Sequence, residues 1–278
     1  MTTQPTSAPV AVVTGASSGL GAIFAQRLGD RGFHLLLTGR HPGRLDQVRR
    51  RVLVSAPGCA VTLVTADLAT SDGVLALLHE LGDRPVDLLV NNASFGTYGS
   101  FERSDTAREM GVIGVDVAAL VRLTRAVLPG MLERGRGGVL NVASTIAFQP
   151  APYQATYGAA KAFVLSFSQA LWQETRHRGV TVTALCPGPA KTGFLDGLHH
   201  AAASQTAVYA KLAEPGPVVD AGLRALGRGM PVVVPGLRNQ AIAFLPHHPA
   251  PPHHLNVRPV SRPEGCPVAF WGSAGVSP

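Results

Sequence analysis

Short apolar segments rich in β-branched residues alternate along the chain with longer segments whose apolar residues recur every three or four positions. The short segments predict strands at residues 10–14, 34–38, 61–65, 86–90, 138–142, 180–185 and 231–234. The longer segments predict helices at residues 20–31, 44–55, 72–81, 105–128, 154–178 and 218–228, ended by glycines such as Gly32, Gly179 and Gly229. The strands are continuous Val and Leu runs, as expected when both faces are buried. We therefore predict an α/β fold: a doubly wound, seven-stranded parallel sheet with helices on both faces.

The chain changes character after the sixth predicted strand. Residues 189–217 contain no predicted strand, and we expect this segment to form a lid. From residue 246 onward the chain holds eight of its 22 prolines and four of its ten histidines. Proline at this density blocks helices and strands, so we expect one domain at 8–245 and a disordered tail at 246–278. The paired histidines of the tail are compatible with metal binding, but a solvated tail is the simpler interpretation.

Composition and charge argue against several classes of protein. The three cysteines lie far apart without C-x-x-C spacing, which argues against a metal site or a disulfide framework and favours the reducing cytoplasm. No segment approaches the roughly 18 apolar residues of a membrane span, and no signal-peptide pattern occurs, so we expect neither membrane insertion nor export. The formal charge of +7 is scattered and aromatic residues are few, so nucleic-acid binding is not favoured.

A glycine-rich turn joins the first predicted strand to the first predicted helix. Its sequence is Thr14-Gly15-Ala16-Ser17-Ser18-Gly19-Leu20-Gly21. Glycines there allow a tight turn and let backbone N–H groups at the helix N-terminus approach a pyrophosphate, which the helix dipole also attracts. A turn that served packing alone would not need three glycines at this junction. The turn therefore predicts a dinucleotide cofactor.

The end of the second predicted strand indicates which dinucleotide it is. A fold that prefers NAD carries an acidic residue there, which binds the ribose 2′-hydroxyl. This chain instead has Arg40, whose guanidinium can form a bidentate pair with a 2′-phosphate. We therefore expect NADP (NADPH), although an arginine that merely ends a strand in solvent would look the same.

Further motifs follow in order along residues 8–240. They are Asp67-Leu68 after the third strand, Asn91-Asn92-Ala93 after the fourth, Ser144 after the fifth, Tyr157-x-x-x-Lys161 in the next helix, and Pro187-Gly188 with Thr192 after the sixth. Together with the glycine-rich turn, they resemble the short-chain dehydrogenase/reductase superfamily in its single-domain Rossmann form. The surroundings of Ser144 and Tyr157 are most similar to ketoacyl reductases and hydroxysteroid dehydrogenases.

The resemblance implies an oxidoreductase and assigns roles to the matching positions. Its catalytic residues would be Ser144, Tyr157 and Lys161, with Lys161 also holding the hydroxyls of the nicotinamide ribose. The residues that it implies for cofactor binding are Gly15, Ser17, Ser18, Gly19, Leu20, Gly21, Arg40, Asp67, Leu68, Asn92, Ala93, Tyr157, Lys161, Pro187, Gly188 and Thr192. The resemblance implies no metal at this site.

The chemistry of the catalytic trio also follows from the residues themselves. Tyr157 and Lys161 lie four positions apart on one helix face, so an ammonium stands beside a phenol and favours its ionised form. Ser144 can donate a hydrogen bond to a carbonyl oxygen on which negative charge develops. Each residue alone has an ordinary structural explanation, as a core tyrosine, a solvated lysine or a turn cap. Their combination favours acid–base chemistry at a carbonyl group.

Two positions depart from the family pattern. Asp116, in the helix after the fourth strand, stands where the family usually has an asparagine. Its main-chain carbonyl can still hold a water molecule of a proton relay, so we include Asp116 in the catalytic set. Its carboxylate can also pair with Lys161 and weaken the effect of Lys161 on Tyr157. Ser94 replaces the glycine that commonly follows Asn-Asn-Ala. A catalytically weakened NADP-binding regulator or scaffold is therefore the alternative function.

Substrate choice is expected to depend on the lid and on the cleft mouth. The mouth residues are Phe95, Thr97, Tyr98, Thr145, Phe148, Gln149 and Tyr153, which are mostly apolar or neutral. An apolar ketone or a 3-ketoacyl compound is the predicted small-molecule substrate. In the family the two long helices pair across a two-fold axis, which implies a homodimer or homotetramer. Leu165, Gln169 and Trp172 form a candidate second surface, although packing within the chain would give the same pattern.

Overall fold

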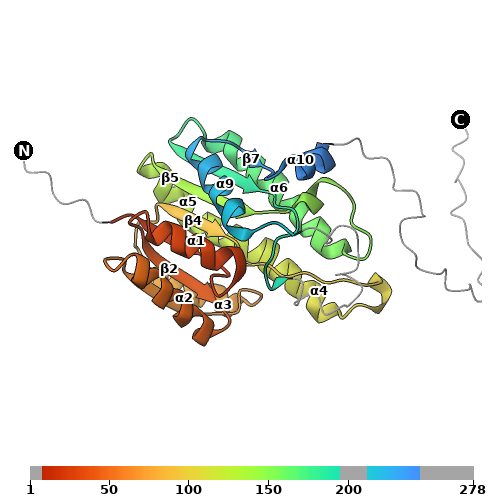
Figure 1. The fold of residues 1–278 in the computed structure, drawn as a ribbon, viewed down its shortest axis with the longest axis horizontal. Coiled ribbons are helices and arrows are strands. Elements are labelled where there is room, and N and C mark those ends of the chain that lie inside the picture. The colour runs from red at the N-terminus through yellow and green to blue at the C-terminus, as the bar shows by residue number, and fades with distance from the viewer. Residues whose placement is uncertain (1–7, 195–211, 245–278) are drawn as a thin grey trace, which may run out of the picture. The chain divides into compact units, whose positions relative to one another are not determined.

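The computed structural model describes residues 8–194 and 212–244, which form a parallel sheet flanked by helices (Figure 1). The strands are β1 (Val10–Val13), β2 (His34–Gly39), β3 (Val61–Thr65), β4 (Leu88–Asn91), β5 (Gly137–Val142), β6 (Val180–Leu185) and β7 (Val232–Val233). The helices of the described part are α1 (Gly19–Gly29), α2 (Pro42–Ser55), α3 (Ser71–Leu81), α4 (Thr106–Ile113), α5 (Leu120–Glu133), α6 (Ala155–Thr175), α9 (Pro215–Gly227) and α10 (Leu237–Phe244). The π-helical turn η2 (Gly114–Ala119) joins α4 to α5, and short 3-10 turns occur at η1 (Phe101–Arg103) and η3 (Thr145–Phe148).

The predicted seven-stranded parallel sheet is confirmed. Its strand order is β3-β2-β1-β4-β5-β6-β7, and each neighbouring pair is parallel. The predicted helix at 105–128 is in fact α4, η2 and α5 in succession, and it continues to Glu133 with Pro129 inside α5. Helix α10 was not predicted. The tail expected at 246–278 lies outside the described residues.

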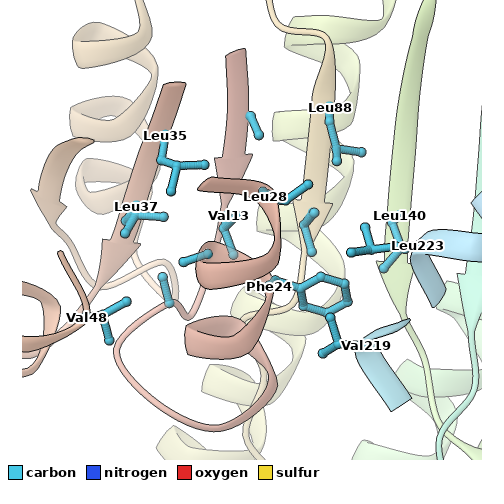
Figure 2. Close-up of a cluster of buried hydrophobic side chains, with 14 of the residues drawn as sticks. Val13, Phe24, Leu28, Leu35, Leu37, Val48, Leu88, Leu140, Val219 and Leu223 are labelled. Atoms are coloured by element: carbon cyan, nitrogen blue, oxygen red, sulfur yellow. The ribbon is translucent and has the colours of Figure 1, made fainter. Parts of the chain in front are cut away.

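Two hydrophobic layers hold the helices against opposite faces of the sheet. Successive side chains of a strand point to opposite faces, so Ala11 and Val13 of β1 join one layer and Val12 joins the other. The first layer packs α1, α2 and α9 on the sheet, with Phe24 of α1 fully buried at its centre (Figure 2). The second layer packs α3 and α5 on the opposite face. Burial on both faces explains why the strands are apolar throughout.

The strand order reverses direction between β1 and β4. From β1 the chain moves outward through β2 and β3, and then it crosses back to β4 on the other side of β1. In sheets of this kind the loops that follow the two strands diverge and leave a crevice at the carboxyl ends, which is the usual ligand site. The glycine-rich turn follows β1, and Asn92 and Ala93 follow β4. The topology therefore brings these two motifs to one place.

The structure shows which residues of α6 are buried within the chain. Val164 and Ser168 are fully buried, and Leu165 packs in the core of the chain itself, which is one of the two alternatives that the sequence left open. Phe163 is 38% exposed and stacks on Phe167, with ring centroids 5.5 Å apart. Val164 and Ser168 lie four positions apart on one side of α6, and this side packs against β6.

A chain of buried polar side chains ties β4, β5 and α6 together. The Asn91 amide donates to Asn141 Oδ1 at 2.8 Å and to Thr124 Oγ1 at 3.1 Å. The Asn141 amide donates to Ser168 Oγ at 2.9 Å, and the Ser168 hydroxyl donates to the Val164 carbonyl at 2.6 Å. Buried polar groups are costly without partners, so this network fixes α6 on the sheet in one position.

Replacement of Asn141 is expected to lower stability. Asn141→Ala leaves the Asn91 amide without its closest acceptor and removes a hydrogen-bond donor to Ser168, which should reduce the free energy of unfolding by about 2 kcal/mol. Denaturant unfolding measures the loss. The exposed Gln47→Ala on α2 is the control and should change stability by less than about 0.5 kcal/mol. Equal effects of the two variants would contradict a stabilising role for the network.

Candidate active site

The glycine-rich turn has a backbone conformation that requires glycine. Gly15 and Gly19 have positive φ angles of 64° and 55°, which are strained for other residues. A Cβ atom on Gly21 would lie 2.3 Å from the Gly15 carbonyl oxygen. The turn is therefore as tight as the sequence predicted, and α1 begins immediately at its end.

The N-terminus of α1 suits an anion. Its N-cap residue, Ser18, makes no side-chain capping hydrogen bond, and no acidic residue occurs in the first turn. The first N–H groups of a helix have no partner within the helix, and the helix dipole adds a positive potential there. The turn carries the neighbouring Ser17 and Gly19 beside these groups. These residues fit the diphosphate of a dinucleotide.

The motif after β4 locks this turn in place. The backbone N–H groups of Asn92 and Ala93 both donate to the Thr14 hydroxyl oxygen at 2.9 Å. The Asn92 amide donates in return to the Thr14 carbonyl at 2.8 Å and to the Gly15 carbonyl at 3.3 Å. The two motifs are thus joined directly, although 77 to 79 positions separate the hydrogen-bonded residues.

Arg40 stands beside the glycine-rich turn. The Ala16 N–H donates to the Thr38 carbonyl of β2 at 2.9 Å, and a Cβ atom on Gly39 would lie 3.2 Å from Ser17 Oγ. The exposed Arg40 guanidinium lies 6.0 Å from the centre of the Phe95 ring. Within residues 8–194 and 212–244 no carboxylate forms an ion pair with Arg40. A cation at this place fits a ribose 2′-phosphate.

Asp67 and Leu68 occupy the turn after β3. The exposed Asp67 carboxylate accepts a hydrogen bond from the Ala69 N–H at 3.0 Å, and Leu68 is buried in the second hydrophobic layer. A Cβ atom on Gly73 would lie 2.0 Å from the Asp67 carbonyl oxygen, so α3 begins in close contact with this turn. The hydrogen bond from the Ala69 N–H and the close contact with α3 therefore fix Asp67 at the carboxyl edge of the sheet.

The segment after β6 extends over the glycine-rich turn. Pro187 and Gly188 are buried, and the Pro187 carbonyl accepts a hydrogen bond from the Thr145 N–H at 2.9 Å. A Cβ atom on Gly19 would lie 3.1 Å from Thr192 Cβ, so Thr192 faces the start of α1. These positions therefore lie opposite the predicted diphosphate site.

The expected lid is described only at its two ends. An isolated parallel bridge pairs Ala190 with Ala213, and the Lys191 side chain forms an ion pair with Glu214. Sequence analysis predicted no strand pairing in this segment. Residues 195–211 lie outside the described part of the chain.

Ser144 and Tyr157 come from neighbouring elements at the carboxyl edge. Ser144 follows β5 and caps η3, where its hydroxyl oxygen accepts a hydrogen bond from the Ile146 N–H at 3.3 Å. Tyr157 lies in the first turn of α6, and η3 packs against α6. The Tyr157 ring is buried and lies 5.3 Å, centroid to centroid, from the ring of Phe194. Sequence analysis did not identify Phe194, because it belongs to a segment without a periodic pattern.

Lys161 is buried one turn further along α6, with only 2% of its surface exposed. Its ammonium donates to the Val142 carbonyl of β5 at 2.9 Å and lies 5.6 Å from the centre of the Tyr157 ring. Asp116 Oδ2 lies 3.5 Å from the same nitrogen. A buried ammonium is costly unless it has such partners. The helix spacing predicted from the sequence thus places the ammonium beside the phenol.

Asp116 is on the π-helical turn η2, and its carboxyl group is fully buried. Its Oδ2 atom accepts a hydrogen bond from the Ser94 hydroxyl at 2.9 Å. Burial raises the pKa of Asp116, and the ammonium of Lys161 and the Ser94 hydroxyl offset part of this rise. Burial also raises the pKa of the nearby Cys186 thiol to about 12. The predicted contact between Asp116 and Lys161 is therefore present, and the Ser94 contact is new.

In the described part of the chain, no helix has both the length and the apolar character that crossing a bilayer requires.

Known proteins are similar to this chain in sequence. A family model described as short chain dehydrogenase matches residues 9–203. An uncharacterized oxidoreductase of Staphylococcus saprophyticus is 34% identical over 185 residues, which are 66% of this chain and 79% of that protein. A very-long-chain 3-oxoacyl-CoA reductase of Mycosarcoma maydis is 34% identical over 184 residues, which are 65% of this chain and 53% of that protein.

A solved structure extends the likeness to three dimensions. The short-chain dehydrogenase from Sphingobium yanoikuyae in complex with NADPH superposes with a TM-score of 0.77 and 32% identity, covering 84% of this chain and 90% of that one. The family match covers well over half of the chain and includes the glycine-rich turn, Ser144, Tyr157 and Lys161. The chain therefore belongs to the short-chain dehydrogenase/reductase family and is an NAD(P)-dependent oxidoreductase.

Proposed function

We propose that the protein transfers hydride between NADPH and the carbonyl carbon of an apolar ketone or 3-ketoacyl compound. The observation that carries this proposal is the buried ammonium of Lys161, held 5.6 Å from the ring of Tyr157 at the carboxyl edge of the sheet. Ser144 follows β5, the strand whose Val142 carbonyl accepts the hydrogen bond from Lys161. An acid, a cation and a hydrogen-bond donor are thus available at one place.

The residues act on the carbonyl oxygen in a defined order. The Ser144 hydroxyl donates a hydrogen bond to the carbonyl oxygen and stabilises the negative charge that develops there. The Tyr157 hydroxyl then gives its proton to the alkoxide, and the Lys161 ammonium stabilises the resulting phenolate. When bound, the nicotinamide supplies the hydride for reduction and accepts it in the reverse reaction. Tyr157 regains its proton from solvent, so ketone, NADPH and one proton yield alcohol and NADP⁺.

Preference for NADP over NAD is supported by Arg40. The guanidinium is exposed beside the glycine-rich turn, and its position follows the second strand, where an acid would favour NAD. The similar dehydrogenase from Sphingobium yanoikuyae was solved with NADPH. The further residues proposed to hold the cofactor are Gly15, Ser17, Ser18, Gly19, Leu20, Gly21, Asp67, Leu68, Asn92, Ala93, Tyr157, Lys161, Pro187, Gly188 and Thr192.

An apolar substrate is supported by the aromatic residues of the cleft mouth. Tyr98 and Tyr153 lie with ring centroids 6.2 Å apart, and burial raises the pKa of Tyr98, which favours its neutral form. Phe194 contacts Tyr157 directly. The similar protein of Mycosarcoma maydis is named for reduction of 3-oxoacyl-CoA. These neutral aromatic surfaces suit an apolar ketone or acyl chain.

A homodimer or homotetramer is the proposed assembly. Helices α4 and α6 pack against each other, and each exposes large apolar side chains. Met110 and Ile113 of α4 are 58% and 39% exposed, and Phe163 of α6 is 38% exposed. Contact with a second copy of the chain would remove this apolar surface from water.

Removal of the Arg40 charge is expected to change cofactor preference. Arg40→Ala should weaken NADPH binding by about tenfold or more, because a charge-assisted pair is lost, and it should leave NADH binding nearly unchanged. Fluorescence titration with both cofactors measures this. Arg31→Ala, which removes another exposed arginine at the far end of α1, is the control. Equal weakening of both cofactors would contradict recognition of the 2′-phosphate.

Removal of the Tyr157 hydroxyl is expected to abolish most of the turnover. Tyr157→Phe should lower kcat on a panel of apolar ketones and 3-ketoacyl thioesters by about 10² to 10⁴, with NADPH binding preserved. Tyr98→Phe, which removes a phenol at the cleft mouth, should change kcat less than about threefold. If the unaltered protein binds NADPH but turns over no compound of the panel, the alternative function is supported instead. That alternative is a catalytically weakened regulator or scaffold, and it was based on Asp116 in place of the usual asparagine.

The assembly can be measured directly. Light scattering at micromolar protein should give two or four times the chain mass of 28.9 kDa, and Phe163→Glu should lower that mass because a charge cannot be buried cheaply at an apolar contact. The exposed Gln47→Glu on α2 is the control, because it adds the same charge outside α4 and α6. A single-chain mass for the unaltered protein would contradict the proposal.

A further inference from the structure

The two positions at which this chain departs from its family pattern are in contact with each other. Ser94 lies in the loop after β4 and Asp116 on η2, and the Ser94 hydroxyl donates to Asp116 Oδ2 at 2.9 Å. A glycine at position 94 would provide no donor, and an asparagine at position 116 would carry no charge. The Ser94 hydroxyl thus supplies a hydrogen-bond donor where the Asp116 carboxylate needs one.

The carboxylate acts on the catalytic lysine. Asp116 Oδ2 lies 3.5 Å from the Lys161 ammonium, and both side chains are almost completely inaccessible to solvent. The ammonium also donates to the Val142 carbonyl, on β5. An ammonium has three N–H groups. These two partners restrain its orientation and leave one N–H group for another acceptor.

The remaining neighbours of this pair bear on its charge. From α6, Lys161 is the cation that acts on Asp116, and Tyr157 contributes a phenol near the same ammonium. From the end of β6, the Cys186 thiol has a pKa raised to about 12 and is neutral at ordinary pH. From the loop after β4 come the Ser94 hydroxyl and the Phe95 N–H, both of which favour the ionised carboxylate. A single cation and these two donors therefore compensate the buried carboxylate.

We propose that Ser94 and Asp116 together are positioning residues for Lys161. The Ser94 hydroxyl favours the ionised form of the carboxylate and holds it in place beside the ammonium, and the carboxylate offsets part of the positive charge that Lys161 presents to Tyr157. The pair thereby sets the pH range in which Tyr157 exchanges its proton. This inference rests on the proposed function of Tyr157 as the acid–base group.

The first test is the pH profile of kcat/KM for alcohol oxidation, in which Tyr157 must accept a proton. Asp116→Asn removes the negative charge, so Lys161 acts fully on Tyr157 and the rise in activity should move to lower pH by about one unit. Ser94→Ala favours the protonated carboxyl and should cause a smaller shift in the same direction. The double variant should match Asp116→Asn alone, because the hydroxyl acts through the carboxylate.

The matched control is Ser100→Ala. Ser100 belongs to the same loop, and its side chain makes no capping hydrogen bond. This variant should leave the pH profile the same as that of the unaltered protein. A shift equal to that of Ser94→Ala would mean that loop changes in general act on Tyr157, and it would overturn the proposal.

The second test is thermal unfolding of the same four proteins without substrate. Asp116 is the buried ion-pair partner of the Lys161 ammonium, and removal of one partner of a buried ion pair is destabilising. Asp116→Asn should therefore lower Tm by a few degrees relative to the unaltered protein between pH 5 and pH 8. Ser94→Ala should lower Tm at pH 8, but it should have no such effect in the Asp116→Asn background.

Two results would overturn the proposal. One is an unchanged pH profile together with an unchanged Tm in Asp116→Asn, since the carboxylate would then carry no effective charge. The other is a Ser94→Ala effect of the same size in both backgrounds, since Ser94 would then act independently of Asp116. If no alcohol is oxidised, the proposed function fails, and the Tm cycle by itself decides whether the two residues are coupled.

Discussion

Burial of a single ammonium group organises this site. Lys161 is placed under the carboxyl edge of the sheet by α6, and water reaches almost none of its surface. A buried cation must find fixed partners, and it finds the Val142 carbonyl and the Asp116 carboxylate. Because Tyr157 lies one turn earlier on the same helix, anything that fixes the lysine also fixes the phenol.

The position of α6 depends in turn on polar groups deep in the sheet. Asn91 and Asn141 lie side by side on β4 and β5, and Ser168 connects them to the middle of α6. Hydrogen bonds have preferred distances and angles, so they select one register of the helix where apolar contacts alone would tolerate several. The catalytic edge and this buried network thus belong to one rigid arrangement.

The cofactor side of the crevice is fixed by a different kind of contact. The Thr14 hydroxyl oxygen accepts hydrogen bonds from two backbone N–H groups of the segment after β4. The two loops lie so close together that a side chain at Gly15 would not fit between them. The result is a helix N-terminus held open for an anion, with Arg40 beside it. The proposed phosphate recognition therefore rests on backbone geometry together with Arg40, whereas the proposed acid–base chemistry rests on side chains of α6 and on Ser144.

The sequence alone determined the fold class, the glycine-rich turn and the spacing of Tyr157 and Lys161, because hydrophobic period, glycine placement and helical repeat are local properties of the chain. It also identified Arg40 and Asp116 as positions where the residue type changes the chemistry. It missed α10 and Phe194, which follow segments without a periodic pattern. It left open whether Leu165 meets a second chain or the core of its own chain, because a helix that is apolar on several sides does not reveal which side meets the sheet. Only the tertiary structure brought Ser94 to Asp116 and both to Lys161, since contacts between loops after different strands depend on how the whole sheet is assembled.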